Sequence, residues 1–102
     1  MFVHMGTHYP KADQQQAIEA AMKHFAQVAS EQPGSLQVIT VAEQDGPRRT
    51  TITVWEARAA FDAALPVLRE AIADVPWDDW QTQKTDVQLS EMIFAAGALA
   101  ES

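Results

Sequence analysis

The chain has 102 residues, with 14 acidic and 7 basic side chains and a net charge of -7. This acidic balance argues against nucleic acid and anionic membrane surfaces as partners, and the basic residues cluster only at Arg48-Arg49. The length indicates one domain, and the lack of cysteine excludes disulfides, thiolate metal sites and a cysteine nucleophile.

The N-terminal sequence bears on the compartment. Strand-like sequence starts at Phe2, and no basic segment followed by an apolar segment comes before it. No apolar run approaches the roughly 20 residues that a helix needs to span a bilayer. We therefore expect a cytoplasmic protein without a membrane partner.

The first half of the chain predicts a strand, a helix and a second strand. The first strand covers residues 2–9 and ends at Pro10, because proline has no N–H to give to a neighbouring strand. Apolar residues at helical spacing predict a helix over residues 14–31, which a Pro-Gly pair ends. Residues 36–43 are rich in valine, isoleucine and threonine, which is typical of a strand.

The second half predicts a hairpin, a second helix and a last strand. An Asp-Gly-Pro turn at residues 45–47 predicts that the third strand returns antiparallel to the second. In the second helix we expect a break near residues 64–65, because Pro66 would cost about 3 kcal/mol in a helix interior. A loop over residues 75–86 and a strand over residues 87–94 follow.

This β-α-β-β-α-β order is that of a ferredoxin-like α+β fold, an antiparallel four-stranded sheet with both helices on one face. Residues 1–94 would form this single domain, and residues 95–102 a flexible C-terminal tail. The other face of the sheet has no cover within one chain. We therefore predict a homodimer through the open sheet face.

The period of the third strand, residues 50–55, predicts which side chains share a face, because alternate residues of a strand point to opposite sides. We expect the aliphatic side chains of the first and third strands to pack on the helices: Val3, Met5, Ile52 and Val54. The open face would then present Phe2, His4, His8, Thr51, Thr53 and Trp55. Two such faces, packed together, would enclose a pocket for a small molecule.

Two segments are distinctive. One is Gln32-Pro33-Gly34-Ser35-Leu36, between the first helix and the second strand. The other is Thr-Val-Trp-Glu-Ala-Arg-Ala-Ala-Phe over residues 53–61, where the third strand meets the second helix. With the element order over residues 2–94, they resemble the antibiotic-biosynthesis-monooxygenase-like family of dimeric α+β barrels. The resemblance implies a dimer in which two sheets form a barrel, each subunit keeping a pocket between its sheet and its helices or covering loops.

The resemblance also implies candidate activities. Some members oxygenate polycyclic aromatic substrates without metal or flavin, others open haem, and many have no established activity. Trp55 matches a tryptophan that contributes to the pocket in both active branches. The haem-opening branch also has an asparagine near the position of His4, and an iron-ligating histidine in the second helical region. Residues 57–75 contain no histidine, which disfavours haem degradation.

The catalytic candidates are His4 and Trp55. With a pKa near 6.5, the His4 imidazole could deprotonate a phenol or orient a peroxide; alternatively it hydrogen-bonds a threonine of a neighbouring strand. Trp55 could stack on a substrate or fill the core between sheets. The candidates for substrate binding are His8, Thr51, Thr53, Trp55 and Trp77.

Two further features concern a metal site and the segment over residues 77–80. His4 and His8 lie roughly 13 Å apart along one strand face, too far to chelate one metal ion, so we predict no metal site. The resemblance to the oxygenase members implies that no cofactor is bound. The segment Trp77-Asp78-Asp79-Trp80 could form a lid over the pocket or brace a partner subunit.

The sequence therefore predicts a homodimeric, cofactor-independent monooxygenase acting on an aromatic or quinone-like small molecule. The alternative is a noncatalytic dimeric barrel that binds a small ligand or is associated with stress.

Overall fold

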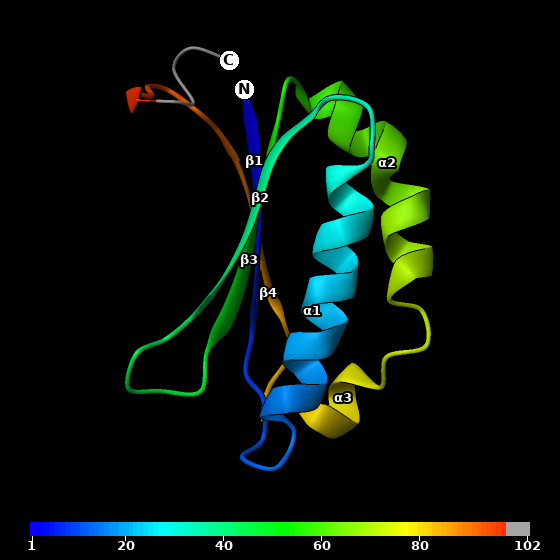
Figure 1. Cartoon of the computed structure of the whole chain (residues 1–102), viewed down its shortest axis with the longest axis vertical. Coiled ribbons are helices and arrows are strands. Elements are labelled where there is room, and N and C mark those ends of the chain that lie inside the picture. Colours follow the sequence, from blue (N-terminus) through cyan, green and yellow to red (C-terminus); the bar gives the residue numbers. More distant parts are fainter. Residues whose placement is uncertain (98–102) are drawn as a thin grey trace.

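The computed structural model describes residues 1–97 of the chain (Figure 1). Its strands are β1 (Phe2–His8), β2 (Ser35–Ala42), β3 (Arg49–Trp55) and β4 (Asp86–Glu91), and its helices are α1 (Gln15–Ser30), α2 (Arg58–Ala71) and α3 (Trp77–Trp80). The four strands form one antiparallel sheet in the order β2-β3-β1-β4. Helices α1 and α2 cover one face, and no helix of residues 1–97 covers the other (Figure 1). The predicted ferredoxin-like fold is confirmed, and the sheet is not closed.

Two predicted details of the second half were wrong. Helix α2 continues through Pro66 without the expected break. Proline has no N–H, so the carbonyl of Asp62 receives no hydrogen bond from residue 66. Asp62 and Pro66 are both exposed, so water can bind that carbonyl instead. The loop expected over residues 75–86 contains the short helix α3. Of the predicted tail over residues 95–102, the part from residue 98 onward lies outside the described residues.

The predicted orientation of the sheet was also wrong. The helix-facing side carries the aromatic and threonine residues, and Phe2, Thr53 and Trp55 are 4%, 0% and 0% exposed. A core cluster forms there from Phe2, Ala29, Trp55, Phe61, Ala64 and Leu68. Large aromatic rings supply more buried apolar area than the aliphatic side chains do, and the threonine hydroxyls can be satisfied by neighbouring donors.

The open face of the sheet is consequently aliphatic in its central part and polar along β4, where Gln88 and Ser90 pair with Met5 and Val3. In the pairing register Met5 lies opposite Ile52, and Ile52 lies opposite Ile39. Ile39 and Val41 on β2 are 42% and 46% exposed. We call the set Val3, Met5, Ile39, Val41 and Ile52 the open-face patch; Val54 has the same alternation in β3 but is only 5% exposed. Exposed aliphatic side chains gathered on one sheet face are more typical of a protein–protein contact than of a solvated sheet.

The two segments that carry the family resemblance contact each other. Gly34 ends the turn after α1 with φ +84, a backbone conformation that side chains disfavour. A Cβ on this residue would lie 2.5 Å from Cβ of Ala60 in α2. The carbonyl of Gly34 also accepts a 2.8 Å hydrogen bond from the N–H of Glu56. A glycine here thus lets the end of β3 and the start of α2 pack against the turn.

Helix α3 is attached to the end of β1 by backbone hydrogen bonds. The N–H of Lys11 donates to the carbonyl of Trp80 at 2.8 Å, and the N–H of Thr82 donates to the carbonyl of Tyr9 at 2.9 Å. Pro10 forms an isolated antiparallel bridge with Gln81. These contacts place α3 at the lower end of the sheet in Figure 1. No helix within residues 1–97 is long and apolar enough to cross a membrane.

Candidate functional site

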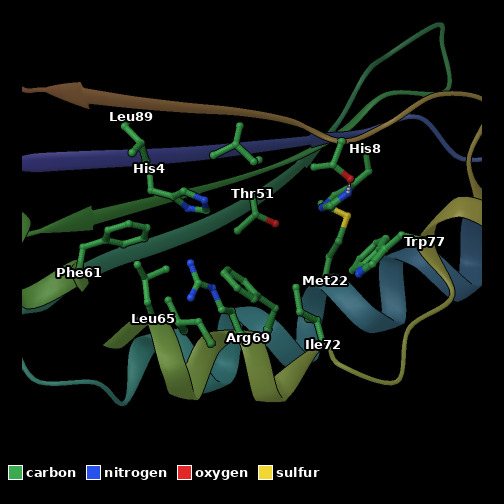
Figure 2. Close-up of a pocket in the computed structure, with 15 residues that line it drawn as sticks. His4, His8, Met22, Thr51, Phe61, Leu65, Arg69, Ile72, Trp77 and Leu89 are labelled. Carbon is green, nitrogen blue, oxygen red and sulfur yellow. Dashed lines mark hydrogen bonds between the residues drawn. The ribbon is translucent and has the colours of Figure 1, made fainter. Parts of the chain in front are cut away.

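A pocket of about 340 Å³ lies between the helix-facing side of the sheet and the helices (Figure 2). Its sheet side consists of His4, Gly6, His8, Thr51, Val87 and Leu89, its helix side of Met22, Phe25, Phe61, Leu65, Leu68, Arg69 and Ile72, and Trp77 and Thr85 complete it. The volume is near the lower end of the roughly 300–1,000 Å³ range of small-molecule sites, and a mostly apolar wall with few polar groups is also typical of them.

His4 lies in the sheet wall of the pocket, with its ring among aromatic side chains. The ring centroids of His4 and Phe61 are 5.0 Å apart with planes at 28°, a stacked pair, and the Phe25 ring lies at 6.3 Å. On its other side, Nδ1 of His4 is 3.3 Å from the Thr53 hydroxyl oxygen. The ring is therefore held by stacking on one side and by a hydrogen bond on the other.

Trp55 lies behind the pocket wall. Its indole N–H donates a 2.7 Å hydrogen bond to the hydroxyl oxygen of Thr53. Its ring meets the edge of Phe61 at 5.7 Å between centroids, with planes at 71°. Trp55 and Thr53 are thus one layer beneath the pocket surface, and they reach it through His4 and Phe61, which both line it.

His8 and Trp77 form the end of the pocket next to α3. Their rings are stacked, with centroids 4.5 Å apart and planes at 8°. Nδ1 of His8 is 3.0 Å from the hydroxyl oxygen of Thr85. That oxygen also accepts a 3.0 Å hydrogen bond from the side-chain amide of Gln81, whose own oxygen accepts the N–H of Tyr9. These bonds keep Trp77 over the pocket end.

Both pocket histidines are neutral at pH 7. Burial lowers the pKa of His4 below its ordinary value of 6.5. Burial lowers the pKa of His8 further, to about 4. A neutral imidazole can accept a proton from a bound substrate, or donate its own N–H to an oxygen atom, depending on its tautomer.

Comparison with known proteins places the chain in a family. The family model of antibiotic biosynthesis monooxygenases matches residues 1–65, from the first strand into helix α2. The chain belongs to the antibiotic biosynthesis monooxygenase family. The pocket is therefore the candidate functional site of this family member. Some of its lining residues lie within residues 1–65, and the others come after residue 65.

Solved structures share the fold at low sequence identity. A protein from Nitrosomonas europaea described as an antibiotic biosynthesis monooxygenase has 17% identity and a TM-score of 0.76, covering 92% of this chain and 100% of its own. SnoaB, a cofactor-independent oxygenase from Streptomyces nogalater, has 18% identity and a TM-score of 0.74, covering 92% and 95%. MhuD, crystallised with two manganese protoporphyrin IX molecules per active site, has 18% identity and a TM-score of 0.74, covering 96% and 100%.

The structure brings together most of the site candidates of this family member. His4, His8, Thr51 and Trp77 all line the pocket, while Thr53 and Trp55 lie behind it. The pocket is enclosed within one chain, between sheet and helices, and the open face does not contribute to it. Trp77 stacks on His8 and lines the pocket, and Trp80 does not line it. Residues 1–97 contain no group of three or more potential metal-ligating side chains.

Sequence reasoning missed most of the helix wall of the pocket. Phe61, Leu65 and Arg69 are four residues apart and Ile72 follows three later, so they share one side of α2. The sequence does show that Arg69 falls within the apolar stripe of this helix, so its place in the pocket wall could have been predicted. Gln81 and Thr85 were also missed, and no local pattern marks them, because their contacts to β1 span the chain.

Proposed function

We propose that this protein is a homodimeric enzyme that oxygenates a hydroxylated aromatic or quinone-like small molecule without a bound cofactor. The observation that carries the proposal is the position of His4, a neutral imidazole in the wall of an aromatic-lined pocket. Membership of the antibiotic biosynthesis monooxygenase family supports the reaction class. The substrate would lie among the rings of Phe25, Phe61 and Trp77, which offer stacking surfaces to a planar molecule.

His4 would act as the general base. When Nδ1–H of His4 donates to the Thr53 hydroxyl, that hydroxyl can donate onward to the carbonyl oxygen of His4, 3.5 Å away. This tautomer leaves Nε2 with a lone pair, free to accept the proton of a substrate hydroxyl. Trp55 would act through Thr53 as a positioning residue, because its N–H occupies a lone pair of the same hydroxyl oxygen.

The reaction balances without a reductant. For the probe 1-naphthol, C10H8O and O2 give 1,4-naphthoquinone, C10H6O2, and H2O. A new C–O bond forms at the ring carbon opposite the hydroxyl, that carbon loses its hydrogen, and the O–O bond breaks. The substrate supplies all four electrons that reduce O2, so the protein needs only to bind the substrate, accept its proton and admit oxygen.

The homodimer would form through the open sheet face. The open-face patch gathers aliphatic side chains on the side opposite the pocket, and burying it would remove exposed Ile39 and Val41 from water. Because the pocket lies on the other side of the sheet, each subunit would keep its own complete site. This proposal retains the predicted partner and the predicted face, with aliphatic rather than aromatic residues in the contact.

The test measures oxygen uptake and quinone formation with 1-naphthol. We expect one O2 consumed per quinone formed by the native protein, and a decrease in kcat of about 10²- to 10⁴-fold in His4→Ala. His24→Ala is the matched control, because His24 is exposed on α1 and lies outside the pocket. Binding of 1-naphthol without oxygen uptake would favour the noncatalytic ligand-binding alternative. Unchanged turnover in both His4→Ala and Trp55→Phe would remove their assigned roles.

A further inference from the structure

Arg69 introduces a charge into the otherwise apolar helix wall of the pocket. It follows Phe61 and Leu65 at intervals of four residues on α2, so helical geometry puts all three on the pocket side. Figure 2 shows its guanidinium group extending from α2 into the pocket, toward the sheet side where His4 and Thr51 lie. The residue is also exposed, which places it where a ligand would enter.

Within residues 1–97, Arg69 differs from the other three arginines in having no carboxylate partner. Arg48 pairs with Glu43 at 2.7 Å, Arg49 with Glu19 at 3.2 Å and Arg58 with Asp62 at 3.6 Å. These are the ion pairs of the described part of the chain, within which the Arg69 side chain also makes no hydrogen bond. In a protein with 14 acidic side chains, an arginine directed into a pocket without an acid beside it is available to an anionic ligand.

The other polar groups that line the pocket carry no charge at pH 7. Burial lowers the pKa of both His4 and His8, so both imidazoles are neutral. Thr51 and Thr85 contribute hydroxyls. Among the described residues that line the pocket, Arg69 is therefore the one that carries a charge. This single positive charge faces apolar and aromatic side chains.

We propose that the pocket takes a planar aromatic ligand bearing one anionic oxygen group, a carboxylate or an ionised hydroxyl, and that Arg69 binds this group. The assignment rests on the proposed function, because it names the substrate class for the same pocket. The guanidinium offers a fork of N–H donors that matches the two oxygens of a carboxylate. The aromatic part of the ligand would lie between Phe61 and the end of the pocket at Trp77.

An anion-binding arginine would also assist the reaction. Proton transfer from a phenol with a pKa near 10 to an imidazole with a pKa no higher than 6.5 is unfavourable by at least roughly three orders of magnitude. A cation beside the oxygen atom stabilises the phenolate and so reduces this penalty. Arg69 would hold the ionised hydroxyl while His4 keeps the proton, and the electron-rich phenolate would then react with O2.

The test uses two probes of the same shape and different charge, 2-naphthoate and its neutral analogue 2-naphthamide. Dissociation constants are measured by isothermal titration for the native protein, Arg69→Gln, Arg69→Lys and the control Arg58→Gln. Arg58 is an arginine of the same helix that does not line the pocket. We expect the native protein to prefer 2-naphthoate by about five- to tenfold, as for a partly exposed charge-assisted hydrogen bond.

The variants separate charge from shape. Arg69→Gln should lose the preference for the anion while its affinity for 2-naphthamide stays within twofold, Arg69→Lys should keep part of it, and Arg58→Gln should behave as the native protein. Equal binding of the two probes by the native protein, or a preference that survives in Arg69→Gln, overturns the assignment of Arg69 and leaves the proposed function standing. If neither probe binds, both the assignment and the aromatic substrate class are refuted.

Discussion

The indole N–H of Trp55 donates a 2.7 Å hydrogen bond to the hydroxyl oxygen of Thr53, and both side chains are 0% exposed. Water cannot reach this N–H. Among the described residues, the Thr53 hydroxyl is its hydrogen-bond acceptor. The same hydroxyl contacts Nδ1 of His4 at 3.3 Å. Thr53 therefore connects a core residue with the candidate general base.

Replacement of Thr53 by valine keeps the shape of the side chain and removes its hydroxyl. We expect Thr53→Val to lower the free energy of unfolding by roughly 1–3 kcal/mol, because a buried N–H loses its acceptor. Urea denaturation measures this change. Thr50→Val is the matched control on the other face of β3, where the Thr50 hydroxyl contacts Thr7 and is only partly buried; it should cost less than about 1 kcal/mol. Equal costs for the two variants would contradict a special role of Thr53.

His8 makes the stability of the protein dependent on pH. Its pKa is about 4 in the folded state, against 6.5 for the ordinary imidazole. Between these values the unfolded chain binds a proton that the folded chain does not, so stability is full above about pH 6.5 and falls as the pH drops toward 4. We expect this residue to account for a loss of about 2 kcal/mol between pH 7 and pH 5.

The variant His8→Gln isolates this effect, because glutamine does not titrate and can still contact the hydroxyl of Thr85. Urea unfolding of the native protein and the variant at pH 7 and pH 5, at one protein concentration, gives the difference. His4, whose pKa burial also lowers, is present in both proteins, and its electrostatic effect on His8 is the smallest cause of the lowered His8 pKa. If both proteins lose the same stability between the two pH values, His8 does not have the lowered pKa.

Gly6 sets the space between the two pocket histidines. A Cβ at this position would contact Cε1 of His4 at 3.9 Å, an ordinary van der Waals distance, so the fold accepts alanine. We expect Gly6→Ala to leave stability unchanged or raise it by about 0.4–1 kcal/mol, because alanine restricts the unfolded chain. The added methyl group takes room from the ligand, and the affinity for 2-naphthamide should fall about tenfold.

In contrast to Gly6→Ala, we expect Gly34→Ala to destabilise the protein. With φ +84 and a Cβ that would lie 2.5 Å from that of Ala60, this substitution strains both backbone and packing. We expect it to lower stability by roughly 1–3 kcal/mol. Thermal unfolding and ligand titration of both glycine variants test the two expectations together. An unstable Gly6→Ala variant, or one with native affinity, would be inconsistent with the described pocket.

The open-face patch predicts how charge affects assembly. We expect the native protein to sediment as a dimer at micromolar concentration, and Ile39→Lys to sediment as a folded monomer, because a lysine opposite Ile52 cannot be buried without a partner. Val67→Lys is the control, since Val67 is similarly exposed, at 45%, but lies on α2. A native monomer, or a dimer that persists in Ile39→Lys and dissociates in Val67→Lys, would place the contact elsewhere.

Local patterns were sufficient to predict the order of the elements. The helical spacing before Pro33, the turn at residues 45–47 and the β-branched run before Trp55 each depend on neighbouring residues alone, and the structure has the elements there. The orientation of the sheet was not predictable in this way. Alternation in β3 separates threonine from aliphatic side chains, but it cannot say which set meets the helices and which is left for another surface.

The candidate site was predicted only in part for the same reason. His4 and His8 share a face of β1 by strand period, and this relationship holds in the structure. The stack of His8 on Trp77 and the Gln81–Thr85 hydrogen bond depend on where the chain after α2 returns to β1, which no short pattern specifies. Helical periodicity could have predicted that Arg69 lines the pocket, because Leu65, Arg69 and Ile72 have the spacing of one helix face.

Methionine methyl groups can report whether an aromatic ligand binds between the sheet and the helices. The chain has 4 methionines. Met22 lines the pocket and Met5 belongs to the open-face patch. In a titration of methyl-labelled protein with 2-naphthoate, we expect a saturable ring-current shift of the Met22 methyl signal while that of Met5 stays in place. A saturable shift of Met5 with Met22 unchanged would contradict this expectation.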